Sequence, residues 1–392
     1  MDDTGKAVRL ARRMADIEPF HVMALLARAR ELEAQGRSII HMEIGEPDFP
    51  TPEPILRAGI RALEKGELYY TPATGLPALR EAISRFYRLR YGVEVPASRI
   101  LVTTGASGAL LLACAALVNP GDEVLIADPG YPCNRNFVRA MEGVARAVAV
   151  HAADDYQLAP GHLGRNWGGR TVAAIVASPS NPTGTLVSSE RLSAMAEFAR
   201  ERGGALIVDE IYHGLVYEGD YTTALAFSEN SFIINSFSKY FQMTGWRLGW
   251  LVAPQHYVPE IDKLAQNLYL AAPTPAQYAA LAAFEPETLA ILEKRRQEFQ
   301  ARRDYLVPGL RELGFEVPVM PQGAFYIYAG CGNLARDSYA FARDLLEQAG
   351  VAITPGVDFG SNAPERHVRF AYTNSVGRLQ EGVRRISRFL GR

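Results

Sequence analysis

Seven polar residues follow short apolar runs of this sequence, at positions where they could act together on one ligand. Apolar runs of this length are typical of buried strands, and in an open α/β sheet the ligand binds outside the carboxyl ends of the strands. Serine, asparagine and aspartate are also common at strand ends as caps and turns, so each residue alone indicates little. Their combination predicts a site. The residues are Ser107, Tyr131, Asn181, Asp209, Tyr212, Ser236 and Lys239.

Lys239 has a sequence environment that would make its amine a nucleophile. It lies in the stretch 236–250, SFSKYFQMTGWRLGW, which is aromatic and carries few charges. Burial and the nearby charge of Arg247 would both lower the pKa of the lysine and leave more of it as free amine. A free amine can attack a carbonyl carbon. Although most lysines are exposed, this setting predicts a lysine that forms a Schiff base.

Asp209 ends the apolar run 205–208, within the sequence VDEIYHGL. One interpretation is an N-cap for a following helix. The other is a counter-ion, because a carboxylate facing the nitrogen of a pyridine ring keeps that nitrogen protonated, and a protonated ring withdraws electrons from a carbanion. Tyr212, three residues later, could reach the same ring. Both interpretations remain open at this point.

The segment 104–108, TGASG, opens an apolar helix and could bind an anion. Backbone N–H groups at the start of a helix point towards a bound phosphate, and the helix dipole favours its negative charge. The alternative interpretation is a tight turn that binds no ligand, since such turns contain the same small residues. Arg247 and Ser236 would add the cation and the hydroxyl group that a phosphate site needs.

The elements that would position these residues form an α/β pattern between about residues 99 and 252. Apolar runs suited to burial on both faces alternate with helical stretches, which predicts a doubly wound, mostly parallel sheet. The runs are 100–104, 123–127, 172–177, 205–208 and 232–235.

A second, smaller α+β domain is expected after this core. Residues 286–313 predict a connecting helix, which Pro308 would bend or divide. Strand-like FYIYA, VAITP and HVRFAY follow. We expect residues 1–50 to join this small domain, residues 51–285 to form the large domain, and residues 286–392 to form the small C-terminal domain.

The composition is that of an ordinary globular protein. The chain has 392 residues, 48% of them hydrophobic and 21% charged, which disfavours disorder and coiled coils. Its net charge of −2 offers no excess of positive charge for nucleic acid or an anionic membrane. Three scattered cysteines and the lack of an apolar leader predict a cytoplasmic protein. The seven histidines show no metal-ligand spacing, so no metal is expected.

Three motifs resemble those of one enzyme family. They are SPSNPTG at 178–184, VDEIY at 208–212 and the stretch 236–250 quoted above. In these motifs and their order the chain resembles the pyridoxal-phosphate-dependent aminotransferases of class I and II, the fold type I enzymes of the aspartate aminotransferase superfamily. The resemblance covers nearly the whole chain, from GEPDF at 45–49 and YTPATGLPALREAI at 70–83 to GAFY at 323–326 and HVRFAY at 367–372.

The resemblance implies how the chain would hold the cofactor, pyridoxal 5′-phosphate. Lys239 would form the Schiff base and then move the substrate's proton. Asp209 would pair with the pyridine nitrogen, while Asn181 and Tyr212 would hydrogen-bond the ring hydroxyl. The remaining contacts would come from Tyr131, stacked on the ring, and, at the phosphate, from the N–H groups of Ala106 and Ser107, from Ser236 and Arg247, and from Tyr70 of the neighbouring subunit.

For the substrate, the resemblance assigns the α-carboxylate to Arg369, whose guanidinium could bind it with two hydrogen bonds. Without the motif, Arg369 could equally be an exposed charge at a strand edge. Gly45 would let the backbone approach the same carboxylate, next to Asn181. Ser107 occupies a position where many aspartate-using relatives carry a lysine. An acidic amino acid is therefore disfavoured as the amino donor. The expected pocket lining, Phe20, Ile44, Tyr70, Tyr131 and Tyr326, suits a neutral or aromatic amino acid.

We therefore expect a homodimeric aminotransferase that moves an amino group from an L-amino acid to a 2-oxo acid. The nearest alternative is a C–S β-lyase that uses the same fold and cofactor, because the cofactor carries the chemistry of both. A serine hydrolase using Ser107 is an alternative of another class, although GASGA ends in Ala109 where the G-x-S-x-G elbow has glycine. A DNA-binding regulator is disfavoured, since residues 1–44 are too few for a winged helix before GEPDF.

Overall fold

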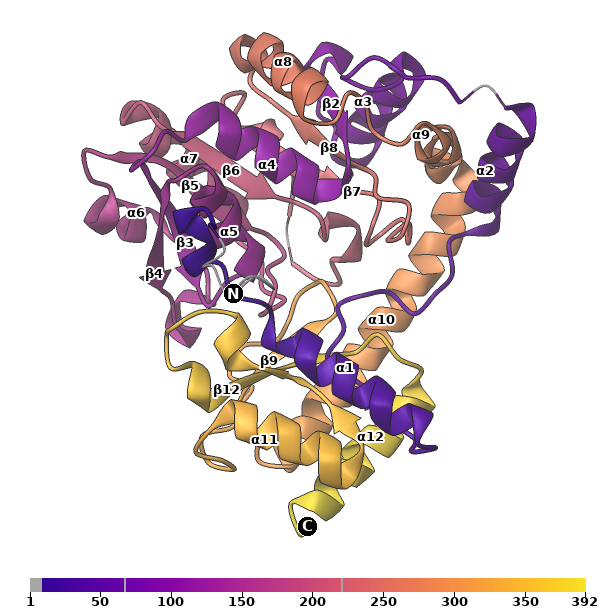
Figure 1. Cartoon of the computed structure of the whole chain (residues 1–392), viewed down its shortest axis with the longest axis vertical. Helices are drawn as coiled ribbons and strands as arrows, with labels where there is room; N and C mark the ends of the chain where they lie inside the picture. Colours follow the sequence, from indigo (N-terminus) through magenta and orange to yellow (C-terminus); the bar gives the residue numbers. More distant parts are fainter. Residues whose placement is uncertain (1–8, 67, 220) are drawn as a thin grey trace.

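The computed structural model describes residues 9–66, 68–219 and 221–392. These residues form a large upper unit and a smaller lower unit, joined by the long helix α10 (Pro286–Glu312) (Figure 1). Helix α1 (His21–Ala34), near the N-terminus, lies in the lower unit beside the yellow C-terminal segments. Both ends of the chain therefore contribute to the smaller unit.

The large unit is built on a seven-stranded sheet with the strand order β2-β8-β7-β6-β5-β3-β4. The pairs that join β4, β3, β5, β6 and β7 are parallel, and β8 is antiparallel to both of its neighbours. The predicted α/β fold with a mostly parallel sheet is confirmed. The strands are β2 (Ile100–Thr103), β3 (Glu123–Asp128), β4 (Val144–Ala149), β5 (Thr171–Ala177), β6 (Ala205–Asp209), β7 (Phe232–Ser236) and β8 (Gly249–Val252).

Two strands of this sheet were not predicted. Strand β4 lies at the edge of the sheet, and most of its side chains are not buried, so VARAVA lacks the continuous apolar run of the inner strands. Strand β8 is short and begins within the last two residues of the motif that contains Lys239. Because β8 hydrogen-bonds to both β2 and β7, it connects the first strand of the sheet to the strand before Lys239.

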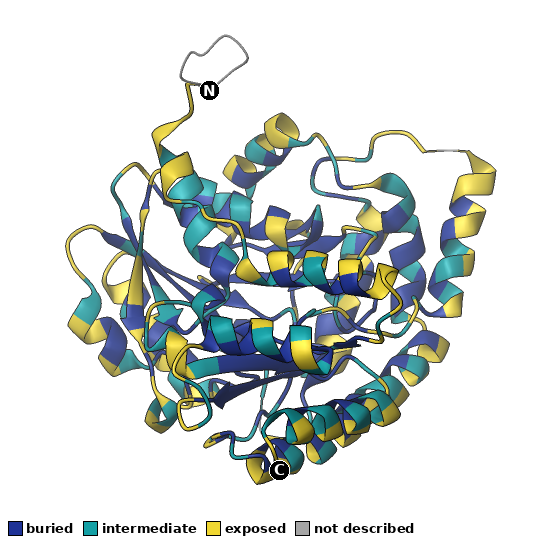
Figure 2. Ribbon diagram, turned by 60° about the horizontal axis from the view of Figure 1, so that its bottom comes forward, coloured by how far each residue is buried: buried dark blue, intermediate teal, exposed yellow. Residues whose placement is uncertain are grey.

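Successive residues of the strands pack on opposite faces of the sheet, as the pleat requires. In β6, Ala205 and Ile207 belong to the core that helices α4, α5 and α8 cover, whereas Leu206 and Val208 face the core that α3, α6 and α7 cover. Figure 2 shows the strands buried between helices whose outer positions are exposed. The remaining helices of this unit are α2 (Glu53–Lys65), α3 (Pro77–Tyr91), α4 (Gly105–Leu117), α5 (Pro132–Ala140), α6 (Pro160–Asn166), α7 (Ser189–Glu201), α8 (Val258–Leu268) and α9 (Thr274–Leu281).

The small unit contains an antiparallel sheet and a separate strand pair. The sheet has the order β11-β12-β9, with β9 (Tyr326–Gly330), β11 (Thr354–Pro355) and β12 (His367–Ala371). The pair joins β1 (Ile40–His41) to β10 (Val351–Ala352) in parallel. Helices α11 (Ser338–Asp344) and α12 (Val376–Phe389) complete the unit. The pairing of β1 with β10 joins residues 40–41 to residues 351–352. The predicted domain boundaries stay a prediction.

Helix α10 continues through Pro308 to Glu312, so the prediction that this proline divides the helix is wrong. Leu306, Val307 and Leu310, on both sides of the proline, are completely buried. A buried leucine contributes about 2 kcal/mol, and a proline inside a helix costs about 3 kcal/mol. Burial of these three side chains therefore stabilises the helix by more than the proline destabilises it. Within the described ranges, none of the helices has the length and hydropathy of a membrane span.

Candidate active site

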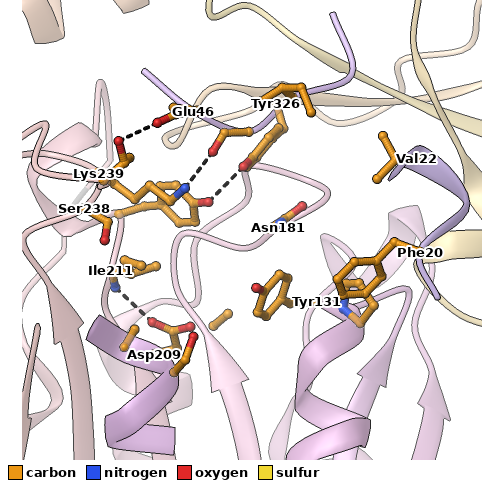
Figure 3. Close-up of a pocket in the computed structure, with 18 of the residues that line it drawn as sticks. Phe20, Val22, Glu46, Tyr131, Asn181, Asp209, Ile211, Ser238, Lys239 and Tyr326 are labelled. Atoms are coloured by element: carbon orange, nitrogen blue, oxygen red, sulfur yellow. Dashed lines mark hydrogen bonds between the residues drawn. The ribbon is translucent and has the colours of Figure 1, made fainter. Parts of the chain in front are cut away.

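A cavity of about 490 Å³ lies outside the carboxyl ends of β5, β6 and β7, where the sequence predicts the ligand. The start of α4 closes it on one side, and Tyr326, Thr354 and Arg369 of the small unit close it on another. Phe20 and Val22, from the N-terminal segment, face it across from Lys239 (Figure 3). The cavity is therefore assembled from three separate parts of the chain.

The structure brings most of the predicted site residues to this cavity. Those that line it are Gly45, Ala106, Ser107, Tyr131, Asn181, Asp209, Tyr212, Lys239, Arg247 and Arg369. Ser236 and Tyr70 do not line it. Tyr70 is 82% exposed, so it is not part of the pocket lining of its own chain, contrary to that expectation.

Ser236 lies beneath the surface of the cavity. Its hydroxyl oxygen is 2.9 Å from Ser238 Oγ and 3.1 Å from the Leu248 carbonyl oxygen, and it accepts a hydrogen bond from the Ser238 N–H. Ser238 is the serine that lines the cavity. Sequence reasoning missed Ser238, although the sequence SFSK offers both serines at alternate positions before Lys239.

Lys239 is the basic group at the centre of the cavity. Its Nζ donates a hydrogen bond to the Gly45 carbonyl, at 2.6 Å (Figure 3). Burial lowers the pKa of Lys239 from 10.5 to about 8; the charges of Arg369 and Arg247 act in the same direction, and Glu46 and Asp209 oppose them. The predicted lowering is confirmed, and a substantial fraction of the amine is neutral near pH 8.

Asp209 ends β6 with its side chain in the cavity wall. Its Oδ1 accepts a hydrogen bond from the Ile211 N–H at 3.1 Å. No helix begins there, since the following 3₁₀ turn has Tyr212 as its N-cap, so the N-cap interpretation of Asp209 is wrong. Burial raises the pKa of Asp209 to about 6, while Ile211 and Lys239 limit the rise. The group is a buried carboxylate that a cationic partner would stabilise.

The start of α4 has the features of an anion site. Thr104, at its N-cap position, makes no capping hydrogen bond, which leaves the first N–H groups available. Arg247 lies against this helix start. Gly105 has a φ of +73°, which favours glycine, and a Cβ there would be 2.7 Å from Arg247 Nη2, so any other residue would displace the guanidinium. The N–H groups and the guanidinium together suit a phosphate dianion.

Arg369, on β12, carries an uncompensated charge. Its Nη1 donates to Asn181 Oδ1 at 2.9 Å, and its Nη2 donates to the Glu43 carbonyl and to Thr354 Oγ1. The guanidinium lies 4.3 Å from the centroid of the Tyr326 ring. All of these partners are neutral, and in the part of the chain that the structure describes no carboxylate pairs with it. Arg369 is 6% exposed, so the strand-edge interpretation is wrong.

Tyr326 connects the two sides of the site. Its hydroxyl is 2.9 Å from the hydroxyl of Tyr212, and burial raises the pKa of both groups, so both stay protonated at neutral pH. A Cβ on Gly45 would be 2.0 Å from the Tyr326 hydroxyl. Gly45 is therefore required for Tyr326 to fit, a reason that the sequence did not reveal.

The chain matches the family described as "Aminotransferase class I and II" over residues 37–386. It belongs to the class I and II aminotransferases. It is 40% identical to the (5-formylfuran-3-yl)methyl phosphate transaminase of Methanocaldococcus jannaschii, over 98% of this chain and all of the relative. It is 37% identical to the valine–pyruvate aminotransferase of Mycobacterium tuberculosis, over 96% of this chain and 97% of the relative.

Solved structures agree with this membership. An aminotransferase from Mycobacterium tuberculosis superposes with a TM-score of 0.95 at 37% identity, over 98% of this chain and 100% of the other. The aspartate aminotransferase of Thermus thermophilus superposes with a TM-score of 0.91 at 35% identity, over 97% of this chain and 100% of the other. The predicted family and its fold type I architecture are confirmed.

The serine hydrolase alternative finds no support in this aminotransferase. A serine nucleophile needs an adjacent base, usually histidine. Ser107 lines the cavity at the start of α4, but the described residues around the cavity include no histidine. Lys239 and Asp209, which that alternative leaves without a role, lie in the cavity wall and both have shifted pKa values.

Proposed function

We propose that this aminotransferase transfers the amino group of a neutral or aromatic L-amino acid to a 2-oxo acid, with pyridoxal 5′-phosphate bound as a Schiff base to Lys239. The observation that carries the proposal is the arrangement of charges in one cavity. A lysine of low pKa, a buried carboxylate and an uncompensated arginine all line it, together with an open helix start. The class I and II aminotransferases generally depend on this cofactor.

The residues present fit the cofactor at each of its polar ends. The free N–H groups of α4 and Arg247 would bind the phosphate, and Asp209 would pair with the pyridine nitrogen. The pairing would keep Asp209 ionised, because a cation favours the charged form of a carboxylate. When bound, pyridoxal phosphate supplies an electron sink for the carbanion that forms when an amino acid loses its α-proton.

The chain's own residues would bind the substrate and move that proton. Arg369, fixed between Asn181 and Tyr326, would bind the α-carboxylate and so orient the Cα–H bond. Lys239 Nζ, as a free amine, would accept the proton from the substrate Cα and return it at C4′ of the cofactor, on the other side of the transferred nitrogen. The hydrogen bond to the Gly45 carbonyl holds this amine at the centre of the cavity.

The lining of the cavity supports a neutral or aromatic substrate. Of the described residues that line it, the basic ones are Lys239, Arg247 and Arg369, and each already has a partner in the proposed reaction. None is left for a second carboxylate. Apolar side chains form part of the wall, namely those of Phe20, Val22, Ile44, Leu110 and Phe359, and the further charged side chains in it, Glu46 and Asp358, are acidic, as is Asp209. The relative named valine–pyruvate aminotransferase also fits this substrate class.

The proposal is tested by the visible spectrum of the purified protein with added pyridoxal phosphate, recorded with each standard amino acid in turn. Neutral or aromatic donors should bleach the cofactor band and release a 2-oxo acid, while aspartate and glutamate should not. A response to acidic donors alone would contradict the substrate class. Absence of the band would exclude Lys239 as a Schiff-base lysine, and release of pyruvate and ammonia from a cysteine conjugate would identify a β-lyase.

The low pKa of Lys239 leads to an expected pH dependence of cofactor capture. Protonated amine does not attack a carbonyl, so the rate constant should rise with pH and level off above about 8. An ordinary lysine would continue to gain neutral amine up to its pKa of 10.5. Stopped-flow mixing of the cofactor-free protein with pyridoxal phosphate measures this profile. A rise that continues without levelling between pH 8 and 10 would contradict the lowered pKa.

We further propose that the enzyme is a homodimer in which Tyr70 contributes to the neighbouring subunit's phosphate site. Tyr70 and Tyr69 are about four-fifths exposed, and Ile60 and Leu63 on the nearby helix α2 are more than half exposed. Large apolar side chains gathered at one surface favour a protein partner. A second copy would cover them and place Tyr70 in its site.

Mixed dimers test this arrangement. Tyr70→Ala and Lys239→Ala subunits should each form inactive or weak homodimers, but a hybrid has one intact site when Tyr70 acts across the interface. Random reassociation makes half of the dimers hybrids, so the mixture should regain about a quarter of the wild-type activity. No gain over the unmixed variants would place Tyr70 in its own subunit's site or outside any site. Sedimentation of the mixture provides the control for reassociation.

A further inference from the structure

We propose that Asp358 is a positioning residue that determines specificity for apolar substrates, because it holds the segment carrying Phe20 and Val22 against the cavity. The inference rests on the proposed function and names the residue that shapes its substrate-binding wall. Asp358 is 3% exposed and belongs to a short 3₁₀ turn after β11. Asp358 also lines the cavity, and the role assigned to it is to hold this segment in place.

The carboxylate of Asp358 binds the start of helix α1. Oδ1 accepts a hydrogen bond from the His21 N–H at 2.8 Å, and Oδ2 accepts one from the Val22 N–H at 2.9 Å. The N-cap residue of α1 is Phe20, whose side chain has no oxygen to make a capping hydrogen bond. A residue 336 positions away in the sequence therefore caps this helix.

The cap controls where the cavity wall lies. Phe20 precedes the two N–H groups that Asp358 binds, Val22 carries one of them, and the side chains of Phe20 and Val22 line the cavity (Figure 3). The His21 ring also makes an edge-on contact with Tyr339 at 5.4 Å, and ion pairs of Asp16 with Arg139 and of Arg28 with Glu347 hold the chain on either side. Loss of the carboxylate would leave residues 20–22, two of which line the cavity, without their own hydrogen bonds to the small unit.

The turn that carries Asp358 is itself fastened to the large unit. The Asp128 carboxylate, at the end of β3, accepts hydrogen bonds from the Ser361 N–H and hydroxyl and from the Asn362 N–H. The Phe359 carbonyl accepts one from the Gly130 N–H. Phe359 also lines the cavity and lies 4.9 Å beneath the Arg369 guanidinium. The same turn therefore positions both the Arg369 guanidinium and the apolar side chains of the cavity wall.

The experiment compares Asp358→Ala with Asp122→Ala in the holoenzyme. Asp122 accepts a hydrogen bond from the Asn119 N–H at 2.8 Å and does not line the cavity, so its loss removes the same kind of contact away from residues 20–22. Two quantities are measured: the ratio of kcat/KM for leucine or phenylalanine to that for alanine, and hydrogen exchange of the His21 and Val22 amides. Asp358→Asn, which keeps one acceptor oxygen, serves as the conservative variant.

Asp358→Ala is expected to speed exchange of the two amides and to lower the ratio about ten-fold, the scale of a lost helix cap. Asp358→Asn should fall between this variant and the wild type, and Asp122→Ala should change neither quantity. Unchanged exchange would overturn the attachment, and faster exchange with an unchanged ratio would overturn the role in specificity. Failure of the proposed function is distinguishable, because it would already be seen in the wild type as lack of transamination with any donor.

Discussion

Replacement of Lys239 by alanine is expected to lower kcat/KM for every amino donor by at least about 10³-fold, because the variant loses the group proposed to move the substrate's proton. Removal of the amine also removes the bond to the cofactor. The fold should be retained, since the side chain is only partly buried and its one hydrogen bond goes to the Gly45 carbonyl. The expected defect is therefore chemical and not structural.

Two further variants sharpen this expectation. Lys239→Arg keeps the positive charge, but a guanidinium does not lose its proton in proteins, so this variant should be as inactive as Lys239→Ala. Lys263→Ala, an exposed lysine paired with Glu260 on α8, should behave as the wild type. Borohydride reduction followed by peptide mass spectrometry locates the covalent cofactor. A label on another lysine, or turnover by Lys239→Arg near the wild-type level, would exclude the proposed role.

The second large effect is expected for Arg369→Ala. Removing one partner of a buried, hydrogen-bonded charge pair costs about 2–5 kcal/mol, so KM for the amino donor should rise by about 10²-fold or more. The cofactor band should be unchanged. The guanidinium contacts Asn181, Thr354, the Glu43 carbonyl and two aromatic rings, and none of these residues is proposed to bind the phosphate or the pyridine nitrogen.

Arg369→Lys should recover only part of the lost affinity, since an ammonium group cannot form the paired hydrogen bonds of a guanidinium. Arg343→Ala is a suitable control, because Arg343 is an exposed arginine on α11 whose partner is its neighbour Asp344. Steady-state kinetics with one neutral and one aromatic donor measure both variants. Unchanged KM values in Arg369→Ala would remove this residue from the substrate site.

Local patterns in the sequence predicted the inner strands and the residues that follow them. The apolar runs 172–177 and 205–208 matched β5 and β6 to within one residue, because strands buried on both faces are apolar throughout. The same logic placed Lys239 and Asp209 at one edge of one sheet. Strand β4 was missed for the complementary reason, since an edge strand with exposed side chains lacks that pattern.

Alternatives that were open in the sequence were decided by the three-dimensional environment. Arg369 could be an exposed charge or a buried binding group, and only the rings of Tyr326 and Phe359 around it establish the second. Asp209 could be a helix cap until the backbone beyond it proved to begin no helix there. Ser236 and Ser238 are equivalent in sequence, but the turn after β7 directs Ser238 to the cavity.

The sequence by itself determined the family, the parallel sheet and the chemical groups of the site, because these depend on residue types at short spacings along the chain. Only the tertiary structure decided how the small unit and the N-terminal segment close the cavity. Asp358 binds His21 across 337 positions, and Arg369 binds Asn181 across 188. Contacts between residues so far apart produce no periodic pattern in a single sequence. Each partner is a common residue type, and its role arises only when the chain folds.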